Sequence, residues 1–322
     1  MPLQALPREV APPRIEGGTS ITGRVSTSAP AETSPPLTAR VLLRACRPRQ
    51  WAKNLLAFAA PCAAGWLDRP VVAAQATGAF VALCLVSSAT YLVNDVRDRE
   101  QDRAHPRKRL RPVASGELSV RAALRTAALL ALSGIALACA ITPGLGLVVA
   151  GYLALTASYS LWLRRAVVID ILVIAAGFVL RAVAGGVATD IYLSRWFIIV
   201  TACCAIFLVA AKRYAELRAP SDAVPARATL RHYRGWHLRV TLIAAASLAV
   251  VAYASWAFTR PNHILWYGFS IIPLVLWLVR YTALIGRGGG QAPEELILGD
   301  HALLALGILW SGLFVGGVYV GG

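Results

Sequence analysis

The chain has 322 residues, of which 57% are hydrophobic and only 15% are charged, and its mean hydropathy is +0.60. A soluble domain carries roughly a quarter charged residues, so this composition excludes one. The net charge of +16 would suit a nucleic-acid ligand. The way that charge is distributed, described below, argues against nucleic acid and for a membrane protein.

The first 38 residues, 1–38, are rich in Pro, Ser, Thr and Ala and contain no apolar core. We expect them to form a disordered tail, not a signal peptide. Residues 39–47 mix leucine and valine with arginine and predict a short helix on the membrane surface. From residue 39 to residue 322 we expect one membrane domain.

Apolar stretches close to the length that crosses a bilayer recur along this domain. They predict about nine transmembrane helices, at 51–67, 71–93, 120–141, 145–163, 166–188, 194–211, 238–258, 263–282 and 301–321. The shortest, 51–67, contains Pro61 and is the weakest candidate. The predicted fold is an all-α bundle.

Positive charge alternates from one side of these spans to the other. The segment before the first span and the loops 96–119 and 212–237 are rich in Lys and Arg, whereas the intervening loops hold only Arg69, Arg195 and Arg260. By the positive-inside rule, we expect the N-terminus and the two long loops to lie in the cytoplasm. The expected location of the protein is the cell membrane. Contact with anionic membrane lipids would explain most of the cations.

The second span leads into a cluster of carboxylates. Steps of three and four residues place four polar side chains on one helical face: Tyr91, Asn94, Asp98 and Asp102. Such oxygen ligands suit Mg²⁺, which binds through one or two carboxylates plus substrate phosphates. We expect Asp98 and Asp102 to hold Mg²⁺ and Asn94 to orient them. The alternative is a solvated helix end that pairs with the arginines between the acids.

A cationic run follows the acids, with Lys108, Arg109 and Arg111 before Ser115-Gly116. Carboxylates for a metal beside cations for bare phosphate oxygens suit a diphosphate ester. These three cations are therefore candidate phosphate ligands.

Two ionisable residues lie inside the fifth span, Asp170 and Arg181. They share a helical face but lie about 16 Å apart along the axis, so they cannot pair with each other. Because a charge at membrane depth is costly, each needs a partner on another helix or a ligand. We expect Arg181 to face a substrate phosphate, with a structural partner as the alternative. Tyr159 and Arg165, near the end of the fourth span, are further substrate-contact candidates.

The acidic stretch and the Arg111-Pro112 and Ser115-Gly116 pairs resemble the first aspartate motif of the UbiA prenyltransferase superfamily. That motif reads N-D-x-x-D-x-x-x-D and runs into R-P-x-x-S-G. The stretches 47–54, 91–98, 180–189 and 212–217 are most similar to the decaprenyl-phosphate phosphoribosyltransferases of mycobacterial cell-wall synthesis. This resemblance implies Mg²⁺-dependent transfer of 5-phosphoribose from phosphoribosyl diphosphate (PRPP) to a polyprenyl phosphate such as decaprenyl phosphate. Diphosphate is released, and the product lipid serves arabinan synthesis.

One departure from the superfamily is informative. Its second motif, D-x-x-x-D after the sixth span, is replaced by Lys212-Arg213-Tyr214-Ala215-Glu216. Cations in place of a carboxylate suit PRPP, which carries a 5-phosphate besides its diphosphate, and an anionic acceptor. Lys212 and Arg213 would otherwise only anchor the span end. The implied substrate-binding residues are Lys53, Tyr91, Asp95, Lys108, Arg109, Arg111, Tyr159, Arg165, Arg181, Lys212, Arg213 and Glu216.

Two other functions remain as alternatives. One is a superfamily member that prenylates an aromatic or haem acceptor, which the Lys212-Arg213 pair disfavours. The other is a lipid-carrier transporter that uses the acids as an ion site. A transporter of that kind typically has interrupted helices in two related halves, and the sequence shows no such repeat. Assembly into a homo-oligomer is left open.

Overall fold

The computed structural model describes residues 38–161, 167–218, 234–259, 264–288 and 293–320. The expected tail, 1–38, lies outside these ranges except for Thr38. The helices in chain order are α1 (Ala39–Cys46), η1 (Pro48–Phe58), α2 (Ala59–Ala63), α3 (Pro70–Arg97), α4 (Arg99–Arg103), η2 (Lys108–Leu110), α5 (Pro112–Ser115), α6 (Val120–Ile141), α7 (Pro143–Leu161), α8 (Val167–Ala188), α9 (Arg195–Arg218), α10 (Gly235–Phe258), α11 (Ile264–Gly286), α12 (Pro293–Gly299) and α13 (His301–Tyr319). The described part of the chain contains no strand, so the all-α prediction is confirmed.

Among the residues that the structure describes, seven helices are long and apolar enough to cross a membrane: α3, α6, α8, α9, α10, α11 and α13. The 19-residue α7 packs between α6 and α8 and matches the fourth expected span. Large apolar side chains on these helices face outward, with Leu147 77% exposed and Ile308 72% exposed. Such a surface requires lipid around it, so the chain is an integral membrane protein.

The first expected span, 51–67, differs from the other eight, each of which overlaps one long α-helix of the described residues. Here the chain forms the 3₁₀ helix η1 and then the five-residue α2. Arg47, with a φ of 53°, lies in the left-handed region and joins α1 to η1. Pro48 starts η1, and Pro61 lies in the first turn of α2, a position that tolerates proline.

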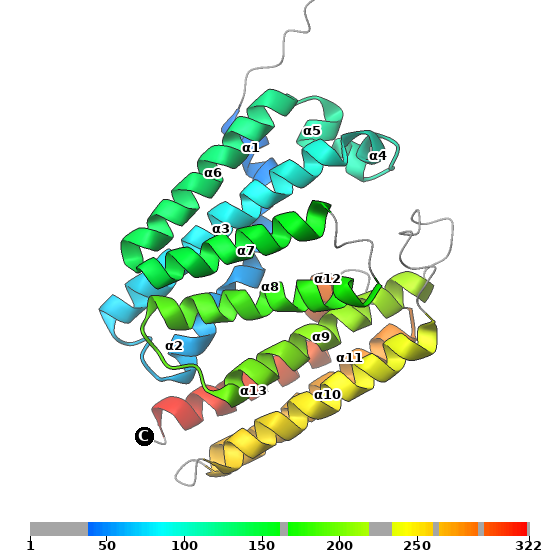
Figure 1. Cartoon of the computed structure of the whole chain (residues 1–322). Coiled ribbons are helices and arrows are strands. Elements are labelled where there is room, and N and C mark those ends of the chain that lie inside the picture. The colour runs from blue at the N-terminus through cyan, green and yellow to red at the C-terminus, as the bar shows by residue number, and fades with distance from the viewer. Residues whose placement is uncertain (1–37, 162–166, 219–233, 260–263, 289–292, 321–322) are drawn as a thin grey trace, which may run out of the picture. The chain divides into compact units, whose positions relative to one another are not determined.

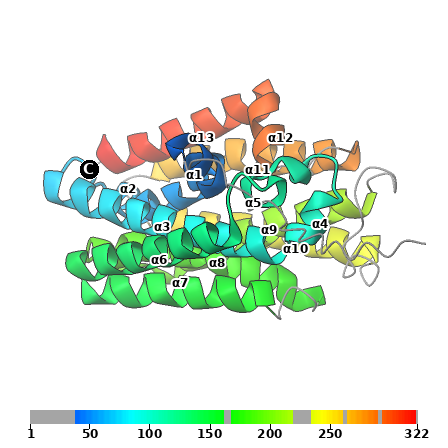
Figure 2. The same ribbon diagram turned by 90° about the horizontal axis from the view of Figure 1, so that it is seen from above.

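Successive long helices run in alternating directions and pack mainly on their neighbours in the chain (Figure 1). As a result, the end of α3, helices α4 and α5, the C-terminal end of α9 and helix α12 lie at the same end of the bundle. A perpendicular view places α11 and α13 on the side opposite α6 and α7 (Figure 2). η1 packs between α3 and α8.

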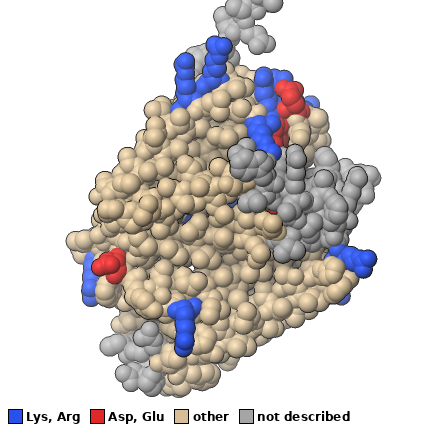
Figure 3. Space-filling view, viewed as in Figure 1, with Lys and Arg blue, Asp and Glu red and all other residues tan. Residues whose placement is uncertain are grey.

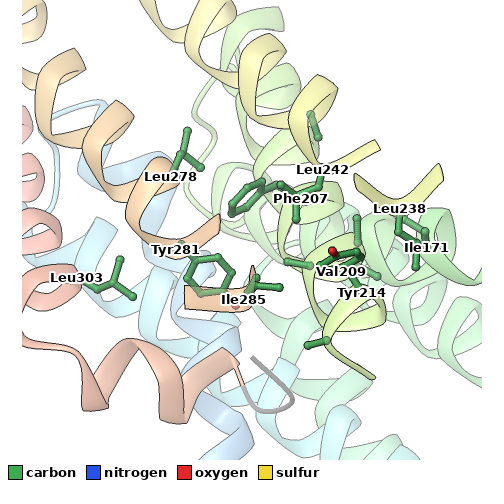
Figure 4. Packing of buried hydrophobic residues seen from close by; sticks show 14 residues of the cluster. Ile171, Phe207, Val209, Tyr214, Leu238, Leu242, Leu278, Tyr281, Ile285 and Leu303 are labelled. Atoms are coloured by element: carbon green, nitrogen blue, oxygen red, sulfur yellow. The ribbon is translucent and has the colours of Figure 1, made fainter. Parts of the chain in front are cut away.

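Small residues make the closest contacts between helices. The core around η1, α3, α6, α7 and α8 includes Ala57, Ala79, Ala82, Ala138, Ala184 and Ala188. A second core joins α8, α9, α10, α11 and α13 around Phe207 and Tyr281, whose rings lie 5.6 Å apart (Figure 4). Inside a membrane, the hydrophobic effect does not drive helices together, because lipid tails are as apolar as the side chains. Small side chains let the helices approach closely, and the resulting van der Waals contacts drive their association.

On the face shown in Figure 3, charged side chains lie towards the two ends of the long helices and leave an uncharged belt between them. This is the distribution that a bilayer imposes on a polytopic protein.

Candidate active site

The acidic motif lies where α3 ends. Asp98 caps α3, and α4 begins with the next residue. The backbone N–H of Asp98 donates to Asn94 O (2.9 Å), and that of Asp102 donates to Asp98 O (2.8 Å). The helical step of four residues therefore continues through the junction at Asp98. Asn94, Asp98 and Asp102 keep the one-turn spacing expected from the sequence.

Two motif carboxylates are buried and paired with arginines. Asp95, 1% exposed, accepts hydrogen bonds from Arg47 and from Arg111 Nη1 (3.2 Å). Asp102, 2% exposed, accepts from Arg111 Nη1 at 2.6 Å. Arg111 therefore bridges the two carboxylates. One alternative from the sequence was that the arginines between the acids pair with them. The arginines that pair with Asp95 and Asp102 are instead Arg47 and Arg111, which lie before and after the acidic stretch.

Arg47 ties η1 to this motif. Besides its ion pair with Asp95, its guanidinium lies 5.1 Å from the centroid of the Tyr91 ring. Burial lowers the pKa of Arg47, and the Asp95 carboxylate acts in the opposite direction. A left-handed backbone at a non-glycine residue costs free energy, and here these contacts hold it in place.

The cationic loop is held from two sides. Arg103 Nε donates to Ala114 O (3.0 Å), and Arg44 of α1 donates to Leu110 O (3.0 Å) and pairs with Glu117 (2.9 Å). Between these contacts, η2 leaves Lys108 and Arg109 exposed. The loop is therefore anchored while its cations reach the solvent.

A second charged cluster joins α8 to α9. Arg213 donates to both oxygens of Asp170, at 2.6 and 3.1 Å, and to Glu216 at 2.7 Å. Tyr159 also donates to Asp170. Asp170 and Arg213 are 1% and 2% exposed. For Asp170 the sequence left open a partner on another helix or a ligand, and the structure shows a partner, Arg213 of α9. Asp170 and Glu216 thus balance the charge of Arg213.

Arg181 has neutral hydrogen-bond partners on three elements. Its Nε donates to Asn54 Oδ1 of η1 (2.8 Å), Nη1 donates to Gly177 O (2.8 Å), and Nη2 donates to Tyr152 OH of α7 (2.6 Å). These contacts correspond to the alternative given for Arg181 in the sequence analysis, a structural partner on another helix. Its contact with a phosphate stays a prediction.

Three further predicted residues are Lys53, Lys212 and Arg165. Lys53 is half-buried on η1, where its Nζ donates to Gln50 Oε1. Lys212 is half-buried beside Arg213, near the end of α9. Arg165 lies outside the described residues. The structure thus forms two charged clusters, one around Asp95 and one around Asp170.

Sequence reasoning did not assign roles to Arg47, Asn54 or Tyr152. Arg47 and Asn54 could be noticed as parts of a motif-like segment. Tyr152, in the apolar α7, carries no signal of its own in the sequence.

The acidic motif fits Mg²⁺ by its chemistry, since its side chains offer carboxylate and amide oxygens. Among the described residues, however, no three His, Cys, Asp or Glu side chains converge as a metal group. Mg²⁺ needs no such group, because it binds through one or two carboxylates and completes its coordination shell with substrate phosphates. Asp98 and Asp102 would hold it, and Asp102 would then share its charge between the ion and Arg111.

The chain was compared with protein families and with characterised proteins, and the matches point to one family. Residues 55–317 match the model of the UbiA prenyltransferase family. A decaprenyl-phosphate phosphoribosyltransferase of Mycolicibacterium smegmatis is 40% identical over 86% of this chain and 92% of its own length. The enzyme of that name from Mycobacterium tuberculosis strain H37Rv is 41% identical over 84% and 91%, and that from Corynebacterium glutamicum is 40% identical over 87% and 87%.

Solved structures share the fold. A UbiA homologue from Archaeoglobus fulgidus bound to GPP and Mg²⁺ aligns with a TM-score of 0.65 and 19% identity, covering 87% of this chain and 99% of that chain. A digeranylgeranylglyceryl phosphate synthase aligns with a TM-score of 0.63 and 14% identity, covering 87% and 98%. At these identities the likeness concerns the fold alone.

Proposed function

The chain belongs to the UbiA prenyltransferase family, and we propose that it is a phosphoribosyltransferase that moves 5-phosphoribose from PRPP to a polyprenyl phosphate. The observation that carries this proposal is about 40% identity, over more than four fifths of the chain, to relatives named decaprenyl-phosphate phosphoribosyltransferase. At 86% coverage, the matched stretch must extend over the positions of both charged clusters. Decaprenyl phosphate is the proposed acceptor, and the product would supply cell-wall arabinan synthesis.

The charge arrangement supports an anionic donor. Lys108 and Arg109 are exposed on the loop beside the motif, and Lys212 lies at the end of α9. Because Arg213 is paired with Asp170 and Glu216, we give it a structural role. We assign the donor phosphates to Lys212 and the loop cations on the sequence pattern, in which cations replace the second acidic motif. Bound Mg²⁺ would add positive charge next to the leaving diphosphate.

The proposed reaction is a substitution at C1 of the ribose. The bond between C1 and the diphosphate oxygen breaks, and its electron pair leaves with the diphosphate. A phosphate oxygen of the lipid forms the new bond to C1. That nucleophile is already ionised near neutral pH, so no side chain has to remove a proton from it. The residues of the site position the two anions and hold them against their mutual repulsion.

The proposed site opens to the cytoplasm, where PRPP would be available. The cation asymmetry along the chain supports this orientation, since the acidic motif lies in a Lys- and Arg-rich loop.

The test is to incubate purified protein with PRPP and decaprenyl phosphate and to measure diphosphate together with the lipid product by mass spectrometry. We expect diphosphate release that requires both substrates and Mg²⁺. Geranyl diphosphate with an aromatic acceptor serves as the comparison. Prenyl transfer without phosphoribosyl transfer would refute the proposal, and so would the absence of any reaction with PRPP.

A further inference from the structure

The 3₁₀ geometry of η1 sorts its side chains into three rows, because this helix repeats every three residues. The exposed row consists of Arg49, Ala52 and Leu55. The row that packs against protein consists of Trp51, Asn54 and Ala57. The third row, which starts at the N-cap, consists of Arg47, Gln50 and Lys53, all half-buried.

The third row begins at the acidic motif and runs into the bundle. Arg47 pairs with Asp95, and Lys53 donates to Gln50 one turn away. At about 2.0 Å per residue, Lys53 lies about 12 Å from Arg47 along the axis. The row therefore carries polar groups from the motif inward.

Successive side chains of the packed row contact successive turns of α3. Trp51 Nε1 donates to Ser88 Oγ (3.1 Å), and Asn54 Nδ2 contacts Cys84 Sγ (3.2 Å) and Ser87 Oγ (3.3 Å). Below Asn54, a Cβ at Gly185 would overlap the carbonyl oxygen of Ala57, so α8 and η1 touch backbone to backbone. These contacts leave η1 little freedom to slide.

Arg181 holds the other side of Asn54. Its Nε donates to Asn54 Oδ1, while its Nη atoms bind Gly177 O and Tyr152 OH, so one guanidinium connects η1, α7 and α8. It is 7% exposed, and the hydrogen-bond acceptors that the structure gives it are all uncharged. A cation at membrane depth costs about 2.5–3.5 kcal/mol on insertion scales, so its retention needs a role that a neutral side chain cannot fill.

We infer that Arg181 is a positioning residue that sets, through Asn54, the rotation of η1 that directs Gln50 and Lys53 to the donor. The inference rests on the proposed function and adds Gln50 to the residues that contact PRPP. Rotation matters because a shift by one residue in a 3₁₀ helix turns each side chain by a third of a circle. Such a shift would exchange the polar row for the exposed row of Arg49, Ala52 and Leu55.

A double-mutant cycle tests the inference. In assays with PRPP varied and decaprenyl phosphate fixed, Arg181→Gln and Lys53→Ala should each raise KM for PRPP about ten- to a hundredfold, as expected for a lost hydrogen bond to a charged group. The double variant should be no worse than the more impaired single variant, because both changes remove the same contact. If Arg181 bound a phosphate itself, the two factors would multiply, and the inference would be overturned.

Matched variants control for damage to the fold. Gly151→Ala on α7 places its Cβ in open space and should leave KM unchanged. Tyr152→Phe removes one partner of Arg181 and is the milder variant if Arg181→Gln does not yield folded protein. It should raise KM for PRPP less than Arg181→Gln and show the same lack of additivity with Lys53→Ala. Additive effects would count against the inference here too.

Labelling separates this inference from the proposed function. Lys53→Cys, in a chain whose six native cysteines are replaced, is treated with a thiol reagent in detergent. Adding Arg181→Gln should change the labelling rate severalfold, and adding Gly151→Ala should not. The experiment needs no turnover, so equal rates would overturn the inference even in an active enzyme. Failure to use PRPP would instead contradict the proposed function.

Discussion

Breaking the buried ion pair between Asp170 and Arg213 from one side should cost more stability than breaking any other ion pair of the described residues, because it leaves a buried charge without its partner. Asp170→Asn keeps the shape of the side chain and removes its charge, which leaves a guanidinium that is 3% exposed with Glu216 as its anionic partner. Breaking a buried pair from one side costs about 3–5 kcal/mol. Because Glu216 remains, we expect the lower end, about 3 kcal/mol.

The control is Glu100→Gln, the same chemical change in an exposed pair. Glu100 and its partner Arg103 are 78% and 44% exposed, so its removal should cost less than about 1 kcal/mol. Unfolding of both variants is followed in detergent by titration with SDS and by heating. Asp170→Leu combined with Arg213→Met removes the pair from both sides and should recover much of the lost stability.

The same variants distinguish structure from substrate binding. If Arg213 only closes α8 against α9, the double variant should keep a nearly normal KM for PRPP. Equal stability of Asp170→Asn and Glu100→Gln, together with a raised KM for PRPP in the double variant, would refute the reasoning. Arg213 would then bind the donor, as the sequence suggested.

Three further predictions concern the metal, the donor and the orientation. Asp98→Asn should abolish Mg²⁺-dependent turnover while the protein still elutes as folded in gel filtration, and full activity would exclude Asp98 as a ligand. Lys212→Ala should raise KM for PRPP about ten- to a hundredfold, with a smaller change for the lipid, if it loses one hydrogen bond to a charged group; a change confined to the lipid KM would assign it to the acceptor. In intact cells an impermeant thiol reagent should label Tyr192→Cys and not Lys108→Cys, and the reverse pattern would invert the topology.

Much of the bundle and the acidic motif could be predicted because their signals are local. A membrane span can be recognised from a run of apolar residues, and the alternation of cations predicts on which side of the membrane each loop lies. The four-residue spacing of Asn94, Asp98 and Asp102 follows from helix geometry and continues through the end of α3. Each of these features depends on residues that are close together in the chain.

Only the tertiary structure decided which charges pair and how the first span is built. Arg47 meets Asp95 across 48 positions, Arg213 meets Asp170 across 43, and Arg181 meets Asn54 across 127. The apolar segment 51–67 predicted a spanning helix. The structure instead has the 3₁₀ helix η1 over much of it, and η1 packs against α3 and α8. An arginine's sequence neighbours do not reveal whether its partner will be a substrate phosphate or a carboxylate on a distant helix. That depends on how helices pack side by side, and the contacts that set this packing join residues far apart in the chain.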